Sequence, residues 1–164
     1  MADPYDVPMR TGDTAPDVEL KDQTGVTRRL SEIAAGKRTV LFFYPAAMTS
    51  GCTKESCHFR DLAGEFEREG AVRVGISMDS VDKQARFADT NGLDYPLLSD
   101  PDGAVAKVFG VKRPLGILKV KRSTFILDED RTVLEVVSSE LNMDTHADKA
   151  LEILAATPRR GSAG

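Results

Sequence analysis

The order of hydrophobic and polar residues predicts seven strands along the chain. We expect strands where β-branched and aromatic residues dominate between turns rich in Gly, Pro and Asp. These stretches are residues 17–20, 26–30, 39–44, 71–77, 95–98, 123–127 and 132–137. The runs 39–44 and 71–77 are almost entirely apolar, which is typical of central strands covered on both faces.

Helical periodicity predicts helices between these strands. In the longest, residues 50–69, apolar positions follow an i, i+3, i+4, i+7 spacing, and Gly70 ends the helix. Shorter helices are expected at residues 31–36, from 79 or 80 to 91, 104–109 and 145–156. Asp79 or Ser80 can cap the second of these, and Thr145-His146-Ala147-Asp148 matches a capping box for the last.

The order strand–helix–strand–helix–strand, followed by a hairpin and a helix, predicts an α/β fold. Its first part implies a parallel sheet with crossover helices, and the last hairpin and helix complete one edge. The two short runs around residues 22–25 add an N-terminal β-hairpin. This central mixed β-sheet flanked by helices resembles the thioredoxin-like fold.

The domain limits follow from the same pattern. We expect a flexible lead over residues 1–10, one domain over residues 11–157 and a frayed tail over residues 158–164. The basic stretch 111–121 contains Pro and Gly and matches neither a helix nor a strand, so it is left as a loop without further placement.

Composition narrows the class of protein. A chain of 164 residues with 41% apolar and 29% charged residues is ordinary for one soluble domain. Its net charge of −4 argues against nonspecific nucleic-acid binding, which needs a dense basic face. No apolar run approaches the length of a membrane span, and the N-terminus lacks the apolar region of a secretory signal, so we expect a cytoplasmic protein. In a reducing compartment two cysteines are more often free, metal-binding or redox-active than permanently bridged.

Both cysteines, Cys52 and Cys57, lie in the predicted helix after strand 39–44. A helix advances about 100° per residue, which places Cys52 in line with Phe59 and Phe66 on the apolar face and Cys57 about 140° away. Cys52 should therefore point into a pocket at the start of the helix, and Cys57 should point outward. Unsatisfied backbone N–H groups at a helix N-terminus favour a thiolate, so Cys52 has the position of a nucleophile.

The spacing of the two cysteines also limits disulfide formation. In an intact helix their Cα atoms lie about 8–9 Å apart, whereas a disulfide needs less than about 7 Å. If the pair is redox-active, residues near 50–58 must unwind during catalysis. The alternative is a buried core thiol at Cys52 and an incidental surface thiol at Cys57. A zinc site from Cys52, Cys57 and His58 matches the usual ligand spacings poorly, and a CxxC redox motif is absent.

The residues around Cys52 carry a resemblance to a known family. The pattern PxxxTxxC after a buried strand, here Pro45-Ala-Ala-Met-Thr49-Ser-Gly-Cys52, resembles the peroxiredoxin active-site motif. A second cysteine five residues later, in TSGCTKESC, is similar to the peroxiredoxin Q subfamily, also called bacterioferritin comigratory protein. The resemblance continues through GDTAPDVELKDQTG, VGISMDS, YPLLSDPDGAVAKVFGV and RSTFILDEDRTVLEVV, so it covers nearly the whole domain.

The resemblance implies a thiol peroxidase for hydrogen peroxide and organic hydroperoxides. Cys52 looks like the peroxidatic cysteine, whose thiolate attacks the O–O bond and becomes a sulfenic acid. Cys57 looks like the resolving cysteine, whose intramolecular disulfide thioredoxin or a similar dithiol protein reduces. Thr49 matches the threonine that hydrogen-bonds the peroxide, Pro45 the proline that shields the pocket, and Arg122 the arginine that polarises the peroxide. No metal or organic cofactor is implied, and the subfamily favours a monomer.

Each of the last three residues also has a structural explanation. Thr49 could cap the helix, Pro45 could end the strand and Arg122 could be a solvated charge at a sheet edge. Their joint spacing favours the active site. Glu55, in the first helical turn, is equally consistent with a site role and with a surface position.

Other polar residues are expected to have structural roles. We place His58 on the helix surface, His146 inside the capping box and Asp79 at a helix cap. Asp128 and Asp130 lie in a predicted hairpin turn and are not expected to form a carboxylate pair.

Departures from the family pattern bear on specificity. Residues 46–48 are Ala-Ala-Met where many relatives carry charged or polar residues, and Ser50 replaces a common proline, so the preferred peroxide stays open. No proline precedes Thr124, where thioredoxin-type disulfide reductases usually have a cis-proline. A thiol–disulfide oxidoreductase is therefore the second hypothesis, and a metal- or partner-binding module without turnover is the third.

Overall fold

A computed structural model describes residues 9–113, 119–140 and 142–159. Within these residues, one sheet has the strand order β2-β1-β5-β4-β3-β6-β7. The strands are β1 (Glu19–Lys21), β2 (Thr27–Arg29), β3 (Arg38–Phe43), β4 (Ala71–Ser77), β5 (Leu97–Ser99), β6 (Ser123–Leu127) and β7 (Val133–Ser138). The helices are α1 (Leu30–Ala34), α2 (Ser50–Asp61), α3 (Ala63–Arg68), α4 (Val81–Asn91), α5 (Ala104–Val108) and α6 (Asp144–Ala156). Each predicted strand is present, with its ends shifted by a few residues at most.

The centre of the sheet is parallel and its edges are antiparallel. β4 lies between β3 and β5 and runs parallel to both. β6 pairs antiparallel with β3, and β7 pairs antiparallel with β6, which completes one edge. At the other edge the hairpin β1–β2 joins β5 through Lys21 and Ser99. The predicted mixed α/β sheet and its N-terminal hairpin are confirmed.

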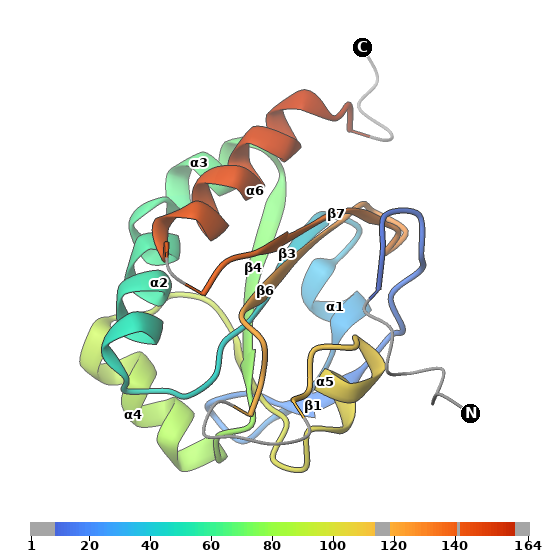
Figure 1. Cartoon of the computed structure of the whole chain (residues 1–164). Helices are drawn as coiled ribbons and strands as arrows, with labels where there is room; N and C mark the ends of the chain where they lie inside the picture. The colour runs from blue at the N-terminus through green and yellow to red at the C-terminus, as the bar shows by residue number, and fades with distance from the viewer. Residues whose placement is uncertain (1–8, 114–118, 141, 160–164) are drawn as a thin grey trace.

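The two faces of the sheet carry separate hydrophobic clusters because side chains alternate along each strand. On β3, Phe42 packs in one cluster with Phe59 of α2 and Phe66 of α3. The next residue, Phe43, lies in the second cluster with Phe109, which follows α5. Figure 1 shows α2, α3, α4 and α6 on one side of the sheet and α1 and α5 on the other. Both cysteines lie on the four-helix side.

The helix predicted over residues 50–69 is interrupted. At Leu62 the backbone adopts φ −97° and ψ 19°, which separates α2 from α3. Gly64, a weak helix former, follows closely. Phe59 and Phe66 on either side of the break stack in one cluster, with ring centroids 5.7 Å apart. Packing against the sheet therefore holds two short helices in place of one.

The predicted capping box at the start of α6 is wrong. The helix begins at Asp144, after Met143, and no side chain caps it. Asp148, the expected partner in the box, instead contacts His58 Nε2 of α2 at 2.7 Å. The carboxylate of Asp148 thus contacts α2 and does not cap the start of α6, although the local sequence predicts that it does.

The basic stretch 111–121 folds back on itself where the structure describes it. Lys112 and Val120 form an antiparallel bridge, and the Arg113 amide donates to the Lys119 carbonyl at 2.8 Å. Val120 is fully buried in the cluster beneath α1 and α5. The stretch is therefore anchored immediately before the start of β6.

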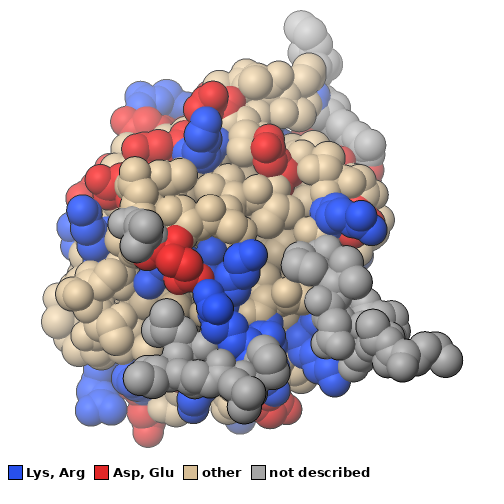
Figure 2. All heavy atoms as spheres, in the orientation of Figure 1, with Lys and Arg blue, Asp and Glu red and all other residues tan. Residues whose placement is uncertain are grey.

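The expected lead and tail fall mostly outside the described residues and stay predictions. Met9, the first residue described, donates its amide to the Phe109 carbonyl at 3.2 Å. None of the described helices combines the length and the apolar character needed to cross a membrane. On the face drawn in Figure 2, acidic and basic side chains are interspersed, with a small basic group beside the grey atoms near the centre.

We expect Gly75→Ala to destabilise the fold. In β4, a Cβ atom at Gly75 would lie 2.9 Å from Leu97 Cδ2 and 3.1 Å from Phe42 Cζ, in the buried core. Such overpacking lowers the free energy of unfolding by about 1–3 kcal/mol. Urea denaturation followed by far-UV circular dichroism measures the change.

Gly64→Ala is the matched control for this variant. Nothing lies within 4 Å of a Cβ atom at Gly64, which is in a helix. The exchange should leave the free energy of unfolding unchanged or raise it by about 0.5–1 kcal/mol. Equal unfolding midpoints for the two variants would contradict the packing argument.

Candidate active site

A tight loop connects β3 to α2 and presents Cys52. Pro45 is buried and ends the strand, because proline lacks the N–H that a central strand needs. Met48 has a left-handed backbone with φ 69° and is 48% exposed. Two residues later α2 begins, and Cys52 lies fully buried in its first turn. The predicted orientation of Cys52 toward the apolar face is confirmed.

Asp79 holds this loop from the connection between β4 and α4. Its Oδ2 accepts hydrogen bonds from the Ala47 amide and the Ser77 hydroxyl, both at 2.7 Å. Its Oδ1 pairs with Lys83 at 3.2 Å. Ser80 caps α4, because its hydroxyl accepts from the Lys83 amide. The prediction that Asp79 caps α4 is therefore wrong. The Asp79 carboxylate instead positions the loop before α2.

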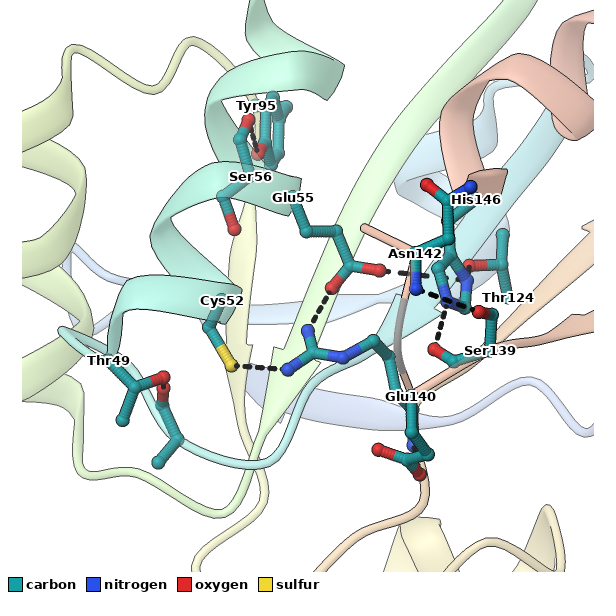
Figure 3. A network of polar contacts seen from close by, with 12 residues as sticks. Thr49, Cys52, Glu55, Ser56, Tyr95, Thr124, Ser139, Glu140, Asn142 and His146 are labelled. Carbon is teal, nitrogen blue, oxygen red and sulfur yellow. Dashed lines mark hydrogen bonds and ion pairs between the residues drawn. The ribbon is translucent and has the colours of Figure 1, made fainter. Parts of the chain in front are cut away.

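Arg122 reaches Cys52 because β6 pairs antiparallel with β3. Ser123 lies opposite Phe43, so the residue before β6 stands beside the loop that follows β3. Arg122 Nη2 donates to the Cys52 sulfur at 3.3 Å, and Nη1 donates to Glu55 Oε1 at 2.7 Å (Figure 3). Only 6% of Arg122 is exposed, so its explanation as a solvated edge charge is wrong.

A permanently charged donor thus faces the sulfur. Burial lowers the pKa of Arg122, but the neighbouring Glu55 and Cys52 outweigh burial and hold this pKa above its ordinary value. Charge-assisted hydrogen bonds to an anion are stronger than neutral ones. The guanidinium of Arg122 is therefore placed to stabilise negative charge that develops at the Cys52 sulfur.

Glu55 lies one turn after Cys52 on the same face of α2 and is fully buried. Among the described residues its Oε2 has no hydrogen-bond partner, and it lies 3.6 Å from His146 Nδ1. Burial raises the pKa of Glu55 to about 8, although Arg122 acts in the opposite direction. Of the two sequence-based alternatives for Glu55, the surface position is wrong, because the structure brings this side chain into the Cys52–Arg122 cluster.

His146 closes the far side of the same cluster from the first turn of α6. Its Nδ1 lies 2.7 Å from Thr124 Oγ1, and its Nε2 lies 2.8 Å from the Ser139 carbonyl. Burial lowers the pKa of His146. The ring joins α6 to β6 and to the end of β7, so it has structural contacts that the sequence did not indicate.

Thr49 and Pro45 complete the surroundings of Cys52. Thr49 is exposed at the start of α2, and its hydroxyl donates to the Ala46 carbonyl at 2.7 Å. It makes no side-chain cap to α2, so the capping explanation is wrong. Figure 3 shows Thr49 at the same end of α2 as Cys52. Four of the five residues matched to the family motif therefore lie where β3 ends and β6 begins, namely Pro45, Thr49, Cys52 and Arg122.

Cys57 lies apart from this cluster. It is half-buried, and its sulfur is 3.7 Å from Asn91 Oδ1 at the end of α4. Both thiols are free, and α2 is continuous from Ser50 to Asp61. Such a helix keeps the two cysteine Cα atoms about 8–9 Å apart. A bond between them therefore requires local unwinding of α2.

Two further candidates have structural surroundings. Asp128 Oδ1 accepts from the Asp130 amide at 2.8 Å and the Thr132 amide at 2.9 Å, as expected for a hairpin turn. In the part of the chain that the structure describes, no three His, Cys, Asp or Glu side chains gather as metal ligands. The alternative zinc site built on the two cysteines and His58 is therefore without the geometry that it needs.

Comparison with known proteins identifies the family. Residues 11–136 match the AhpC/TSA family. This chain is a peroxiredoxin of that family. A putative peroxiredoxin of Mycobacterium tuberculosis is 62% identical over 150 residues, which cover 90% of this chain and 97% of the relative.

Solved peroxiredoxin structures agree with the fold. Peroxidoxin BcpB from Mycobacterium tuberculosis matches with a TM-score of 0.87 at 61% identity, covering 92% of this chain and 99% of that chain. Xanthomonas campestris bacterioferritin comigratory protein, studied for its alkyl peroxide reduction activity, matches with a TM-score of 0.79 at 32% identity, covering 92% and 97%. The mixed sheet is thus the thioredoxin-like peroxiredoxin fold, and the protein is an antioxidant thiol peroxidase with two cysteines.

The sequence carried a readable signal for Glu55. It lies three residues after Cys52 and four before Phe59, on the apolar stripe of the helix, where a carboxylate needs a buried partner. For His146 the signal was weaker. It shares a face of α6 with the buried residues Ala150 and Leu154, at i, i+4 and i+8. What each polar group binds depended on the tertiary structure.

We expect Asp79→Ala to slow peroxide reduction. The variant leaves the Ala47 amide and the Ser77 hydroxyl without their acceptor and loosens the loop before α2. Misplacing a reacting group by about 1 Å can cost up to about 100-fold in rate, so we expect a loss of roughly tenfold or more. Peroxide consumption in competition with a reference peroxidase measures the rate. Asp89→Ala, an exposed change in the adjoining helix α4, is the control, and equal rates for the two variants would contradict the role of Asp79.

Proposed function

We propose that this peroxiredoxin reduces hydrogen peroxide and organic hydroperoxides with Cys52 as peroxidatic cysteine and Cys57 as resolving cysteine. Thioredoxin or a similar dithiol protein then reduces the intramolecular disulfide. The observation that carries the proposal is the 3.3 Å contact between Arg122 Nη2 and the buried Cys52 sulfur at the start of α2. The scheme needs no metal or organic cofactor.

In the first step the Cys52 thiolate attacks a peroxide oxygen. An S–O bond forms, and the O–O bond breaks with its electron pair on the leaving oxygen, which takes up a proton and departs as water or an alcohol. Cys52 becomes a sulfenic acid. Arg122 and the free amides at the start of α2 are preorganised donors for the negative charge on the leaving oxygen. The Thr49 hydroxyl, at the mouth of the site, can turn from Ala46 to the peroxide.

In the second step the Cys57 sulfur attacks the sulfenic sulfur of Cys52. An S–S bond forms and the hydroxyl group leaves as water. The step follows unwinding of α2, because the intact helix holds the two residues too far apart for a disulfide. In the third step a thiolate of the reductant attacks this disulfide and exchange returns both cysteines to the thiol state.

The rim of the site supports an organic substrate. Ala46 is apolar and half-buried, and Met48 is one of the exposed large hydrophobic side chains among the described residues. An apolar rim favours an alkyl group beside the reacting peroxide oxygens. The Xanthomonas campestris relative, studied for alkyl peroxide reduction, points the same way.

A thiol–disulfide oxidoreductase is the second candidate function, and a non-catalytic module is the third. Position 123, before Thr124, is serine, where a disulfide reductase would have a proline. Consumption of peroxide by the protein with a thioredoxin system separates the first function from both others. The cytoplasmic location and the monomeric state stay predictions.

We expect Cys52→Ser to abolish peroxide reduction, because the attacking sulfur is removed. The chain has no Trp, so rapid quenching followed by thiol counting is the suitable measurement. Cys57→Ser is the matched variant: one thiol should be consumed at the original rate, and the product should stay a sulfenic acid that dimedone traps. Oxidation of Cys52→Ser at the full rate would refute the assignment.

We expect Tyr95→Phe to speed disulfide formation. The Tyr95 hydroxyl donates to the Ser56 carbonyl at 2.7 Å, and unwinding of α2 around Cys57 breaks this bond. Losing a bond worth about 1 kcal/mol from the wound state should raise the rate about fivefold. Dimedone trapping against time gives the lifetime of the sulfenic acid.

Tyr44→Phe is the control for the same chemical change. The Tyr44 hydroxyl donates its hydrogen bond to Gln84 Oε1 of α4, an element other than α2. This variant should lose stability without faster disulfide formation. If both variants, or neither, shorten the lifetime of the sulfenic acid, the bond from Tyr95 to Ser56 does not restrain the unwinding.

A further inference from the structure

Behind Arg122, on the side away from Cys52, lies a buried polar cluster that the reaction scheme leaves unused. It consists of Glu55, His146 and Thr124 (Figure 3). All three are fully buried. They come from α2, α6 and β6, so three separate elements place ionisable or polar atoms at one point.

The hydrogen-bond partners define where protons stand in this cluster. His146 Nε2 faces the Ser139 carbonyl at 2.8 Å, which only accepts, so Nε2 carries a proton. In a neutral ring Nδ1 then accepts, and the Thr124 hydroxyl at 2.7 Å donates to it. Glu55 Oε2, at 3.6 Å from Nδ1, has no donor within the part of the chain that the structure describes. The neutral ring beside a carboxylate therefore leaves a place for one more proton between Oε2 and Nδ1.

The charges around Cys52 decide whether Glu55 Oε2 and His146 Nδ1 hold a proton between them. A Cys52 thiolate and Arg122 neutralise each other across 3.3 Å. A Glu55 carboxylate then adds a buried charge without a counterion, which favours the added proton. Once Cys52 is a neutral sulfenic acid, Arg122 needs a counterion, and the Glu55 carboxylate at 2.7 Å supplies it.

Other charged groups near the cluster also shift the pKa values of Glu55 and His146. Glu140 faces it from the segment between β7 and α6, accepts the Arg122 amide at 3.1 Å and raises the pKa of Glu55. Arg113, from the stretch before β6, pairs with Glu140 at 2.9 Å. Arg122 lowers the pKa of both Glu55 and His146. Of these charges, the one that changes during the reaction is on Cys52.

We propose that Glu55 and His146 hold one proton between them while Cys52 is a thiolate and release it when Cys52 is oxidised. Oxidation written alone is RS⁻ + ROOH → RSOH + RO⁻, and the alkoxide needs one proton to leave as an alcohol. The release from Glu55 and His146 offsets that need, so the protein takes up less than one proton from solution. The two residues act through Arg122 and do not touch the peroxide. The inference rests on the proposed role of Cys52.

Proton uptake during a single oxidation tests the inference. Cys57→Ser protein, which stops at the sulfenic acid, is mixed with one equivalent of hydrogen peroxide in weak buffer with a pH indicator. At pH 7 we expect about half a proton or less taken up per Cys52 oxidised, and about one proton when Glu55→Gln is added. At pH 9.5 Glu55 and His146 hold no extra proton either before or after oxidation of Cys52. The proteins with and without Glu55→Gln should then each take up about one proton.

Thiol counting in the same samples separates this inference from the proposed function. If Cys52 is not consumed by peroxide, the proposed function fails. If Cys52 is consumed and the uptake at pH 7 is equal with and without Glu55→Gln, only the inference is overturned. His58→Gln, which changes the other histidine of the chain, is the matched control and should leave the uptake unchanged.

Nuclear magnetic resonance supplies a readout that does not depend on turnover. In the His58→Gln, Cys57→Ser protein, His146 is the only imidazole, so its ¹⁵N signals are assigned without ambiguity. Methyl methanethiosulfonate converts Cys52 to a neutral mixed disulfide in place of the thiolate. We expect the Nδ1 signal of His146 to shift at pH 7 on this change and to stay constant when Glu55→Gln is also present. An Nδ1 signal that is identical before and after the reagent, with Glu55 in place, would overturn the proposal.

Discussion

The buried positive charge of Arg122 is the constraint on which the rest of the site depends. A guanidinium removed from water must be paired, and the available partners, the Cys52 sulfur and the Glu55 carboxylate, come from one face of α2. Arg122 cannot be placed elsewhere without changing the register of β6 on β3, because Ser123 lies opposite Phe43. The sheet register, the start of α2 and the position of a cation beside the Cys52 sulfur are therefore settled together.

The proposed reaction places two opposing requirements on the helix α2. It must be wound for its first amides and Arg122 to stabilise charge at Cys52, and it must unwind for Cys52 to reach Cys57. The contacts along the helix suit both requirements. A single hydrogen bond from Tyr95 holds the Ser56 carbonyl, whereas Phe59 stacks on Phe42 at 4.2 Å in the core. Unwinding breaks the polar contacts of Cys52, Glu55 and Ser56, whereas the ring stacking at Phe59 lies beyond the part that unwinds.

The same physics extends from the site to the last helix. His146 is the point at which α6 contacts both β6 and the acidic side chain of α2. Because a buried charge alters the protonation of its neighbours over several ångströms, the proposed proton release links oxidation of Cys52 to Glu55 and His146 through Arg122. In this proposal the two residues keep the total charge of the site constant without touching the peroxide.

Local sequence determined much of this protein: the strands, the two-faced central sheet, the N-terminal hairpin, and the placement of Cys52 at a helix start, because these depend on spacing and periodicity. Only the tertiary structure decided the break at Leu62, the true partner of Asp148, and the roles of Asp79, Glu55 and His146. Each of the polar side chains had several acceptable local arrangements, and its choice depended on an element distant in the chain. The break at Leu62 depended on packing against the sheet. Periodicity predicts which residues face inward. It does not predict which buried polar side chains pair with one another.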